Sequence, residues 1–520
     1  MEGAPVGDGG WTSCVVSGFR TRNKGGRSGW GAGQRIAYGA SAAPGAGGSG
    51  KANVQQNTRP SPLERFLGTF TDIRPGEGPT GLVLFANVFL LLCAYYFVKP
   101  LRDSWIAVSS VQGLSTMELK AYSSFGQSLL LAGLASLVAN LSHRVTRSNL
   151  VSGSILISMS NLVVFWLLRP GFLAPNVPYA GIAFYLWVGM FGVFLIAQFW
   201  TMAADLYAGE RGTRLLPLIA IGATAGAAFG SWLTTVLVSG GMSPATLLIL
   251  ANIPLAASIV LSRLAYVRGP LGRGRVDPLP RPTADDERTG RAGRGAIGFI
   301  FTHRYLVTVA LVALLTNWVN TNGENLMFRV LQDTLASKAA AQGITDPARV
   351  QELVGRETTL FYSSLFTYVN VIALVAQAFL ASRLLRYGGF GAIMLMLPVI
   401  SLISYSTMAL LPILPVVRSL KIAENSTDYS INNTARQVLW LPTSSETKYR
   451  AKPAIDSLFL RLGDGLAALT VVVGVHFLDL PPRAFFLVNV VLAVAWLLLA
   501  VTIVRAYSRM MSASPEQVPA

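Results

Sequence analysis

Charged residues are scarce in this 520-residue sequence, at 13%, whereas hydrophobic residues make up 52% of it. Soluble domains carry about 25% charged residues, so this composition excludes an ordinary soluble protein and indicates a polytopic membrane protein. Cysteine and histidine are scarcer still. The two cysteines, Cys14 and Cys93, exclude a disulfide framework, and the three scattered histidines offer no ligand spacing for zinc. We therefore expect neither a secreted disulfide scaffold nor a metal centre.

The first 78 residues lack the apolar run of a signal peptide and are rich in Gly, Ser, Ala and Arg, so we expect a disordered tail. Their low acidity also fits an organelle transit peptide. Gly45 to Ala52 nearly forms a phosphate-binding loop, but Ala52 stands where Ser or Thr would bind magnesium, and no strand or helix pattern flanks it. Because no nucleophile, base and orienting residue occur together, we expect no enzyme and no cofactor.

Long apolar runs are what the sequence has in abundance. From Gly81 onward, runs of about 18 to 25 residues recur, and each is long enough to cross a hydrocarbon core of about 30 Å. We count about twelve runs, half of them before the polar stretch 269–295 and half after it. The predicted fold is an all-α polytopic membrane protein in two six-helix halves, residues 79–267 and 304–507. A cytoplasmic linker (268–303) joins the halves, and a short tail (508–520) follows.

Arginine and lysine gather in alternate loops between these runs. Because Lys and Arg in short loops favour the cytoplasmic side, the pattern places both termini in the cytoplasm. It predicts a multi-pass protein of the cell inner membrane, or of the plastid envelope if the tail is a transit peptide. The same loops account for the net charge of +17. No basic groove with interleaved aromatic residues is visible, so we expect no nucleic-acid partner.

Charges at the end of the first span form the first candidate site. Tyr95, Lys99 and Arg102 are spaced to share one helix face, and Asp103 follows them. One interpretation is an interfacial cap whose cations reach into water, with Asp103 neutralising one of them. The other is a site for an anionic substrate, because ions inside a membrane are costly and mark functional sites.

The seventh span also carries a polar face. Asn317, Asn320, Thr321 and Glu324 recur at helical spacing, and Arg329 lies just past them. Glu324 is a candidate for pairing with Arg329 or for accepting a coupling proton. The alternative is that Glu324 already lies at the aqueous boundary of the membrane.

The tenth run is the most polar of the twelve. Lys421, Glu424, Asp428, Asn432 and Arg436 repeat at helical spacing, so hydropathy alone would assign a soluble loop. Removing this run, however, leaves an odd number of spans and places a basic cluster on the wrong side. We therefore predict a membrane helix that lines a water-filled cavity, where transporters bind their substrates.

Candidate gating residues lie in the fourth and eleventh spans and in the loop after the fourth. Salt bridges among them would hold the cytoplasmic ends of helices together in one state. This set comprises Asp205, Arg214, Asp456, Arg461 and Asp464. In the fifth span, Gly222, Gly226 and Gly230 recur every four residues, and this spacing predicts a close approach of another helix.

Three segments together resemble a known family. They are Tyr95 to Asp103, with its Lys99-Pro100-Leu101-Arg102-Asp103 motif, Phe199 to Asp205, and above all Glu424 to Asp456. They resemble the ATP:ADP antiporter (nucleotide transporter) family over about residues 81–508, and most closely its free-living bacterial branch. The resemblance implies a major-facilitator-like, twelve-helix exchanger of ATP and ADP.

A nucleotide exchanger needs several cations against a triphosphate, ideally arginine forks on phosphate oxygens. The candidate substrate ligands are Lys99, Arg102, Arg329, Lys421 and Arg436. The candidate carboxylates, which would neutralise or couple the cavity, are Asp103, Glu324, Glu424 and Asp428. The expected partners are a nucleotide or another organic anion and the lipid bilayer, around a monomer. Two alternatives remain open, a proton-coupled carrier for another organic anion and a membrane scaffold that transports nothing.

Overall fold

The computed structural model describes residues 78–142, 147–169, 172, 179–207, 210–268, 295 and 297–513. Most of the expected tail, most of the expected linker and the last residues lie outside this part. The helices of the first half are α2 (Gly78–Ala107), α3 (Thr116–Ser142), α4 (Arg147–Leu167), α5 (Ala180–Leu206), α6 (Glu210–Ser239), α7 (Thr246–Leu250) and α8 (Asn252–Arg268). The second half holds α10 (Arg304–Ala341), α11 (Pro347–Val375), α12 (Ala381–Leu410), α13 (Leu414–Thr427), α14 (Asn433–Val438), α15 (Ser445–Ala454), α16 (Leu460–Val472) and α17 (Pro482–Ala513).

Four short π-helical segments interrupt the second half. They are η2 (Ala376–Leu380), η3 (Asp428–Asn432), η4 (Ile455–Phe459) and η5 (Val473–Phe477), and each continues an α-helix without a break in the chain direction. A π-helical turn holds more residues than an α-helical turn, so it rotates the faces of the helix on either side of it. Such turns are frequent at functional sites.

Nine helical stretches in the described part of the chain are long and apolar enough to cross a membrane. One of them, Pro347–Leu410, covers α11, η2 and α12 and is long enough for two spans, and the backbone turns to φ 68° and ψ −170° at Gly389 inside α12. Glycine adopts this conformation without the strain that a side chain would add. Adding α3 and the polar run α13–η3–α14 gives the twelve spans that the sequence predicts.

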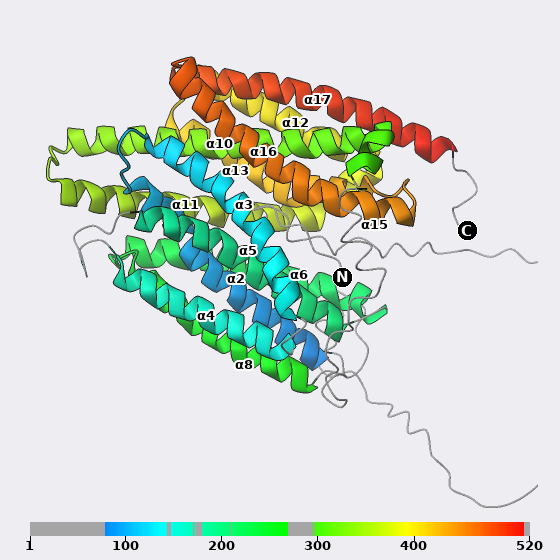
Figure 1. Ribbon diagram of the computed structural model, residues 1–520, viewed down its shortest axis with the longest axis horizontal. Helices are drawn as coiled ribbons and strands as arrows, with labels where there is room; N and C mark the ends of the chain where they lie inside the picture. Colours follow the sequence, from blue (N-terminus) through cyan, green and yellow to red (C-terminus); the bar gives the residue numbers. More distant parts are fainter. Residues whose placement is uncertain are drawn as a thin grey trace, which may run out of the picture.

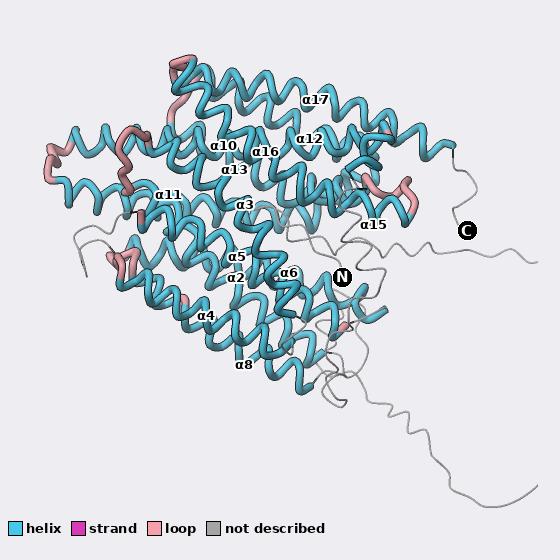
Figure 2. The backbone as a smooth tube through the Cα atoms, viewed as in Figure 1, coloured by secondary structure: helices cyan, strands magenta, loops and turns pink. Residues whose placement is uncertain are grey.

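The helices form two groups that lie side by side (Figure 1). One group contains α2, α4, α5, α6 and α8, and the other contains α10, α12, α13, α16 and α17. Two helices join the groups, since α3 packs against α16 and α11 packs against α2 and α6. Helices make up nearly all of the described backbone, and short turns connect them (Figure 2).

Helix α2 is central to the first group. Its neighbour α6 approaches it closely, because Gly222, Gly226 and Gly230 face the α2 backbone at Phe85, Phe89 and Cys93 in turn. A Cβ atom at any of the three glycines would collide with α2, so the predicted close approach is confirmed.

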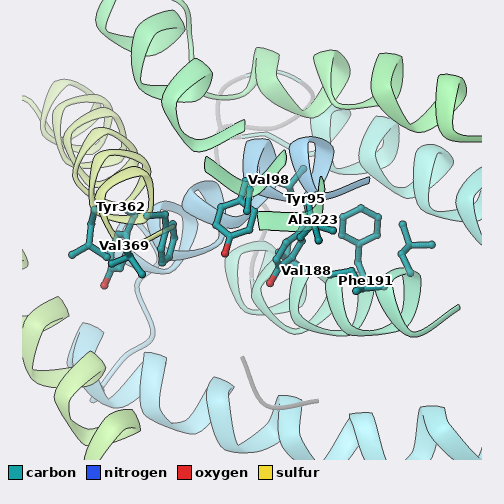
Figure 3. Close-up of a cluster of buried hydrophobic side chains, with 14 of the residues drawn as sticks. Tyr95, Val98, Val188, Phe191, Ala223, Tyr362 and Val369 are labelled. Atoms are coloured by element: carbon teal, nitrogen blue, oxygen red, sulfur yellow. The ribbon is translucent and has the colours of Figure 1, made fainter. Parts of the chain in front are cut away.

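Apolar side chains of α5 and α6 also pack against α2. Figure 3 shows Tyr95 and Val98 of α2 beside Val188 and Phe191 of α5 and Ala223 of α6. This packing fixes the position of the next turn of α2, which carries Lys99 and Arg102.

Candidate functional site

A cavity of about 130 Å³ lies between the two groups of helices. Its walls come from α2, α3, α5, α10, α11, α13, η3, α14, α15, η4 and α16. The charged lining residues are Lys99, Arg102, Lys120, Glu324, Asp428, Arg436, Lys452, Asp456, Arg461 and Asp464. Six of these side chains are cations and four are carboxylates, so the wall has a formal excess of two positive charges. In the low-dielectric interior of a membrane protein, such an excess favours an anion.

Three of the cations, Lys99, Arg102 and Lys120, form what we call the cation pole. All three are buried. The Lys99 ammonium lies 4.4 Å from the centre of the Phe366 ring, and the Arg102 guanidinium lies 4.6 Å from that of Tyr185. These side chains stay among the helices and do not reach into water as the cations of an interfacial cap would.

Asp103 lies behind the cation pole and is completely buried. One of its oxygens lies 2.8 Å from the Lys120 ammonium, and the other lies 3.5 Å from the Arg102 guanidinium. A single carboxylate therefore faces two cations. An anion entering the cavity would balance the remaining charge.

Lys421 is fully buried and is not among the cavity-lining residues. Its ammonium lies 2.9 Å from Glu424 and 3.6 Å from Glu324, and it donates a hydrogen bond of 3.2 Å to Asn320. Glu424 also accepts hydrogen bonds from Tyr405 and from Ser401. We call Lys421, Glu424 and Tyr405 the lysine cage.

Glu324 connects the lysine cage to the cavity. Its side chain is 26% exposed, lines the cavity and accepts a 2.9 Å hydrogen bond from Asn425. This places Glu324 inside the helix bundle, on the polar face of α10 that the sequence predicts.

The polar run α13–η3–α14 lines the opposite wall of the cavity. At η3, Asp428 accepts a 2.7 Å hydrogen bond from Asn432. About two turns after Asp428, Arg436 pairs with Asp456 of η4 at 3.2 Å. Lys452 donates a hydrogen bond to Gln437. At this end of the cavity, cations and carboxylates balance each other, so the positive excess lies at the cation pole.

Asp464 joins the two groups of helices in the middle of the cavity wall. It accepts a 2.6 Å hydrogen bond from Ser128 of α3, and others from Asn317 (2.7 Å) and Thr321 (2.8 Å) of α10. Arg461 lies 3.5 Å from it. This predicted gating residue therefore holds α3, α10 and α16 together at the cavity.

Five predicted site residues are absent from the described lining of the cavity. They are Arg329, Asp205, Lys421, Asp103 and Glu424. Arg329 lies beyond the polar face of α10 and pairs with Asp333 at 3.9 Å. Asp205 lies in the last turn of α5. The side chain of Arg214 lies outside the described part of the structure. Sequence reasoning missed Lys120 and Lys452, which line the cavity.

No protein-family model and no curated protein matches the sequence. Solved structures of transporters do match the fold. The nucleoside transporter NupG matches with a TM-score of 0.54 and 15% identity, over 82% of this chain and 99% of that chain. The peptide transporter POT in complex with sulfate matches with a TM-score of 0.54 and 13% identity, over 86% and 98% of the two chains. A POT family transporter in complex with 5-aminolevulinic acid matches with a TM-score of 0.53 and 12% identity, over 83% and 96%. This chain has their fold. The predicted all-α, major-facilitator-like architecture is thus confirmed.

Proposed function

We propose that this protein is a membrane transporter that exchanges organic phosphate anions, ATP and ADP above all, by alternating access. The observation that carries the proposal is the buried cavity between the two halves, with its excess of positive charge at Lys99, Arg102 and Lys120. Binding sites at the contact between two repeats of a membrane bundle are typical of secondary transporters. The sequence resemblance to ATP:ADP antiporters supports the nucleotide as substrate.

The chemistry of the walls fits the two parts of a nucleotide. Arginine forks and lysine ammonium groups at the cation pole are the usual ligands of phosphate oxygens. Further along the wall, Tyr429 and Trp440 offer aromatic faces, and Asn433 and Gln437 offer amide groups. Amide and aromatic side chains are the groups that bind and stack on a nucleobase. We therefore place the phosphates at the cation pole and the base toward α14.

Exchange, rather than one-way transport, follows from the same charges. To change from one open state to the other, the protein must close around the cation pole. Closing around unbalanced buried cations is costly, whereas closing around a bound anion is not. Each return step would then require a second anion, and this requirement couples the uptake of one nucleotide to the release of another.

We further propose a monomer in the cell inner membrane, or in a plastid envelope, with both termini in the cytoplasm. The positive-inside distribution of arginine and lysine supports this orientation. In this arrangement residues 79–267 and 304–507 form the two moving halves. With α2 starting in the cytoplasm, the end of the bundle at which α2 ends and α3 begins faces outward.

Uptake of radiolabelled ATP into proteoliposomes tests the proposal. We expect saturable uptake into vesicles preloaded with ADP and at least tenfold less into vesicles without internal nucleotide. Unlabelled ADP should compete, whereas neutral adenosine should not, because it lacks the phosphates that the cation pole binds. Uptake that needs a proton gradient and no internal ADP would support the proton-coupled alternative. No uptake by correctly folded protein would remove ATP:ADP exchange.

A further inference from the structure

The two halves touch each other at the end of the bundle where α2 ends and α3 begins, which we call the α2–α3 end. Ser104 donates a 2.7 Å hydrogen bond to the backbone oxygen of Gly355, and His476 lies 2.6 Å from Glu118. Both contacts join one half to the other. For the opposite state of a transporter to form, the contacts at this end must break.

Lys120 belongs both to these contacts and to the cavity wall. It lies in the second turn of α3, in the first half, and is 3% exposed. Its ammonium donates a 2.9 Å hydrogen bond to the Tyr362 hydroxyl, which α11 of the second half carries. It also lies 4.6 Å from the centre of the Phe328 ring and 4.9 Å from that of Tyr362.

The partners of Lys120 divide between the halves. Asp103, 2.8 Å away, is in the first half together with Lys120, so this ion pair survives when the halves separate. Tyr362 and Phe328 are in the second half, so their contacts with Lys120 do not survive. An ammonium has three N–H donors. While the α2–α3 end is closed, two of these donors face Asp103 and Tyr362. When the halves separate, the donor that faced Tyr362 becomes available to a ligand in the cavity.

We propose that Lys120 binds the transported anion and thereby couples occupation of the cavity to opening of the α2–α3 end. The inference rests on the proposed function and assigns this coupling to one ammonium group. With the end closed, Lys120 offers an anion one remaining donor. With the end open, it offers two donors. The anion therefore binds the open state more tightly, and a ligand shifts a conformational equilibrium by its difference in affinity for the two states.

Distances between two spin labels measure the equilibrium directly. Gln112, in the α2–α3 turn, and Thr345, in the α10–α11 turn, are both exposed and belong to different halves. The two turns lie at the same end of the bundle (Figure 1). We would label Gln112→Cys and Thr345→Cys in the full chain with Cys14→Ser and Cys93→Ala, in lipid nanodiscs. The ratio of the long to the short distance gives the ratio of open to closed protein. ATP and pyrophosphate serve as the anions.

We expect both anions to raise the open ratio of the protein with native Lys120 and Tyr362. The variant Tyr362→Phe keeps the ring but loses the hydroxyl, so its open ratio without anion should rise about 10- to 100-fold, the factor for one hydrogen bond to a charged group. ATP and pyrophosphate should then raise the open ratio of Tyr362→Phe by a smaller factor, because the Lys120 donor is already released in this variant. In Lys120→Gln, either anion should leave the ratio of open to closed protein nearly unchanged.

Ser104→Ala is the matched control, because it removes a contact between the halves that involves no cavity cation. Its open ratio should rise without anion, but the factor by which ATP shifts the ratio should equal that of the parent protein. The inference is wrong if Tyr362→Phe and Ser104→Ala respond to ATP alike. It is also wrong if neither anion moves the parent distribution, whatever the vesicle assay reports about ATP:ADP exchange.

Discussion

Replacing Lys421 with methionine lowers the free energy of unfolding by about 3 to 5 kcal/mol in our expectation, the range for removing one partner of a buried ion pair. The side chain is fully buried and lies 2.9 Å from Glu424, which is itself 3% exposed. Without the ammonium, Glu424 keeps the hydroxyls of Tyr405 and Ser401 but stays a buried carboxylate without a cation. Thermal unfolding in detergent measures the loss.

The double variant Lys421→Met with Glu424→Gln should recover most of this stability, because it removes both buried charges together. Glu324 also loses a partner, but its side chain is 26% exposed and can be hydrated from the cavity. Arg436→Gln is the comparison for an ion pair at the cavity, since the Arg436 side chain is 32% exposed. It should destabilise the protein far less. A Lys421→Met protein as stable as the parent would show that Lys421 is not a structural ion.

Replacing Arg102 with glutamine weakens ATP binding by about 10- to 100-fold in our expectation, which corresponds to losing about 1.5 to 3 kcal/mol of charged hydrogen bonding. Arg102 lines the cavity, and its loss leaves Asp103 paired with Lys120 at 2.8 Å. The fold should therefore be retained while the cation pole loses its guanidinium fork. Calorimetric titration of ATP into the purified protein gives the dissociation constant.

Arg329→Gln is the matched control for Arg102→Gln. The sequence pattern makes both arginines candidate ligands, but the structure places Arg329 in a pair with Asp333 and outside the described cavity lining. We expect an unchanged dissociation constant for Arg329→Gln. Equal losses in the two variants would show that the phosphates do not bind at the cation pole.

The spans were predictable from the sequence because hydropathy and length determine which helices can cross a membrane. The break inside Pro347–Leu410 is also visible in the sequence, since the stretch 383–389, with Arg383, Arg386 and Gly389, separates two apolar runs. The polar tenth span was predictable as a helix because its charges recur at helical spacing. Hydropathy alone would not have identified this span.

The sequence does not predict which charged side chains of the tenth span face the cavity. Helical spacing places Lys421, Asp428 and Arg436 on one stripe, but Lys421 packs in the lysine cage, whereas Asp428 and Arg436 line the cavity. The π-helical turn η3 also changes the helical register between Asp428 and Arg436. Spacing in the sequence does not reveal a π-helical turn.

Lys120 was missed because it precedes the apolar run that begins at Ser123 and so resembles the basic flank of a span. Its partners Asp103 and Tyr362 lie on other helices, the second of them 242 residues away. Pairing across such distances depends on how the two halves pack. Asp464 shows the same limit, because its bond to Ser128 crosses between the halves.

Photolabelling with 8-azido-ATP, followed by mass spectrometry of the peptides, tests most directly whether the cavity binds the nucleotide. The azide sits on the base, which we place beside Tyr429 and Trp440. The account predicts label on the segment 425–440, protection by excess ATP or ADP but not by adenosine, and loss of label in Arg102→Gln. Label that ATP does not displace, or that falls on residues outside the cavity walls, would contradict it.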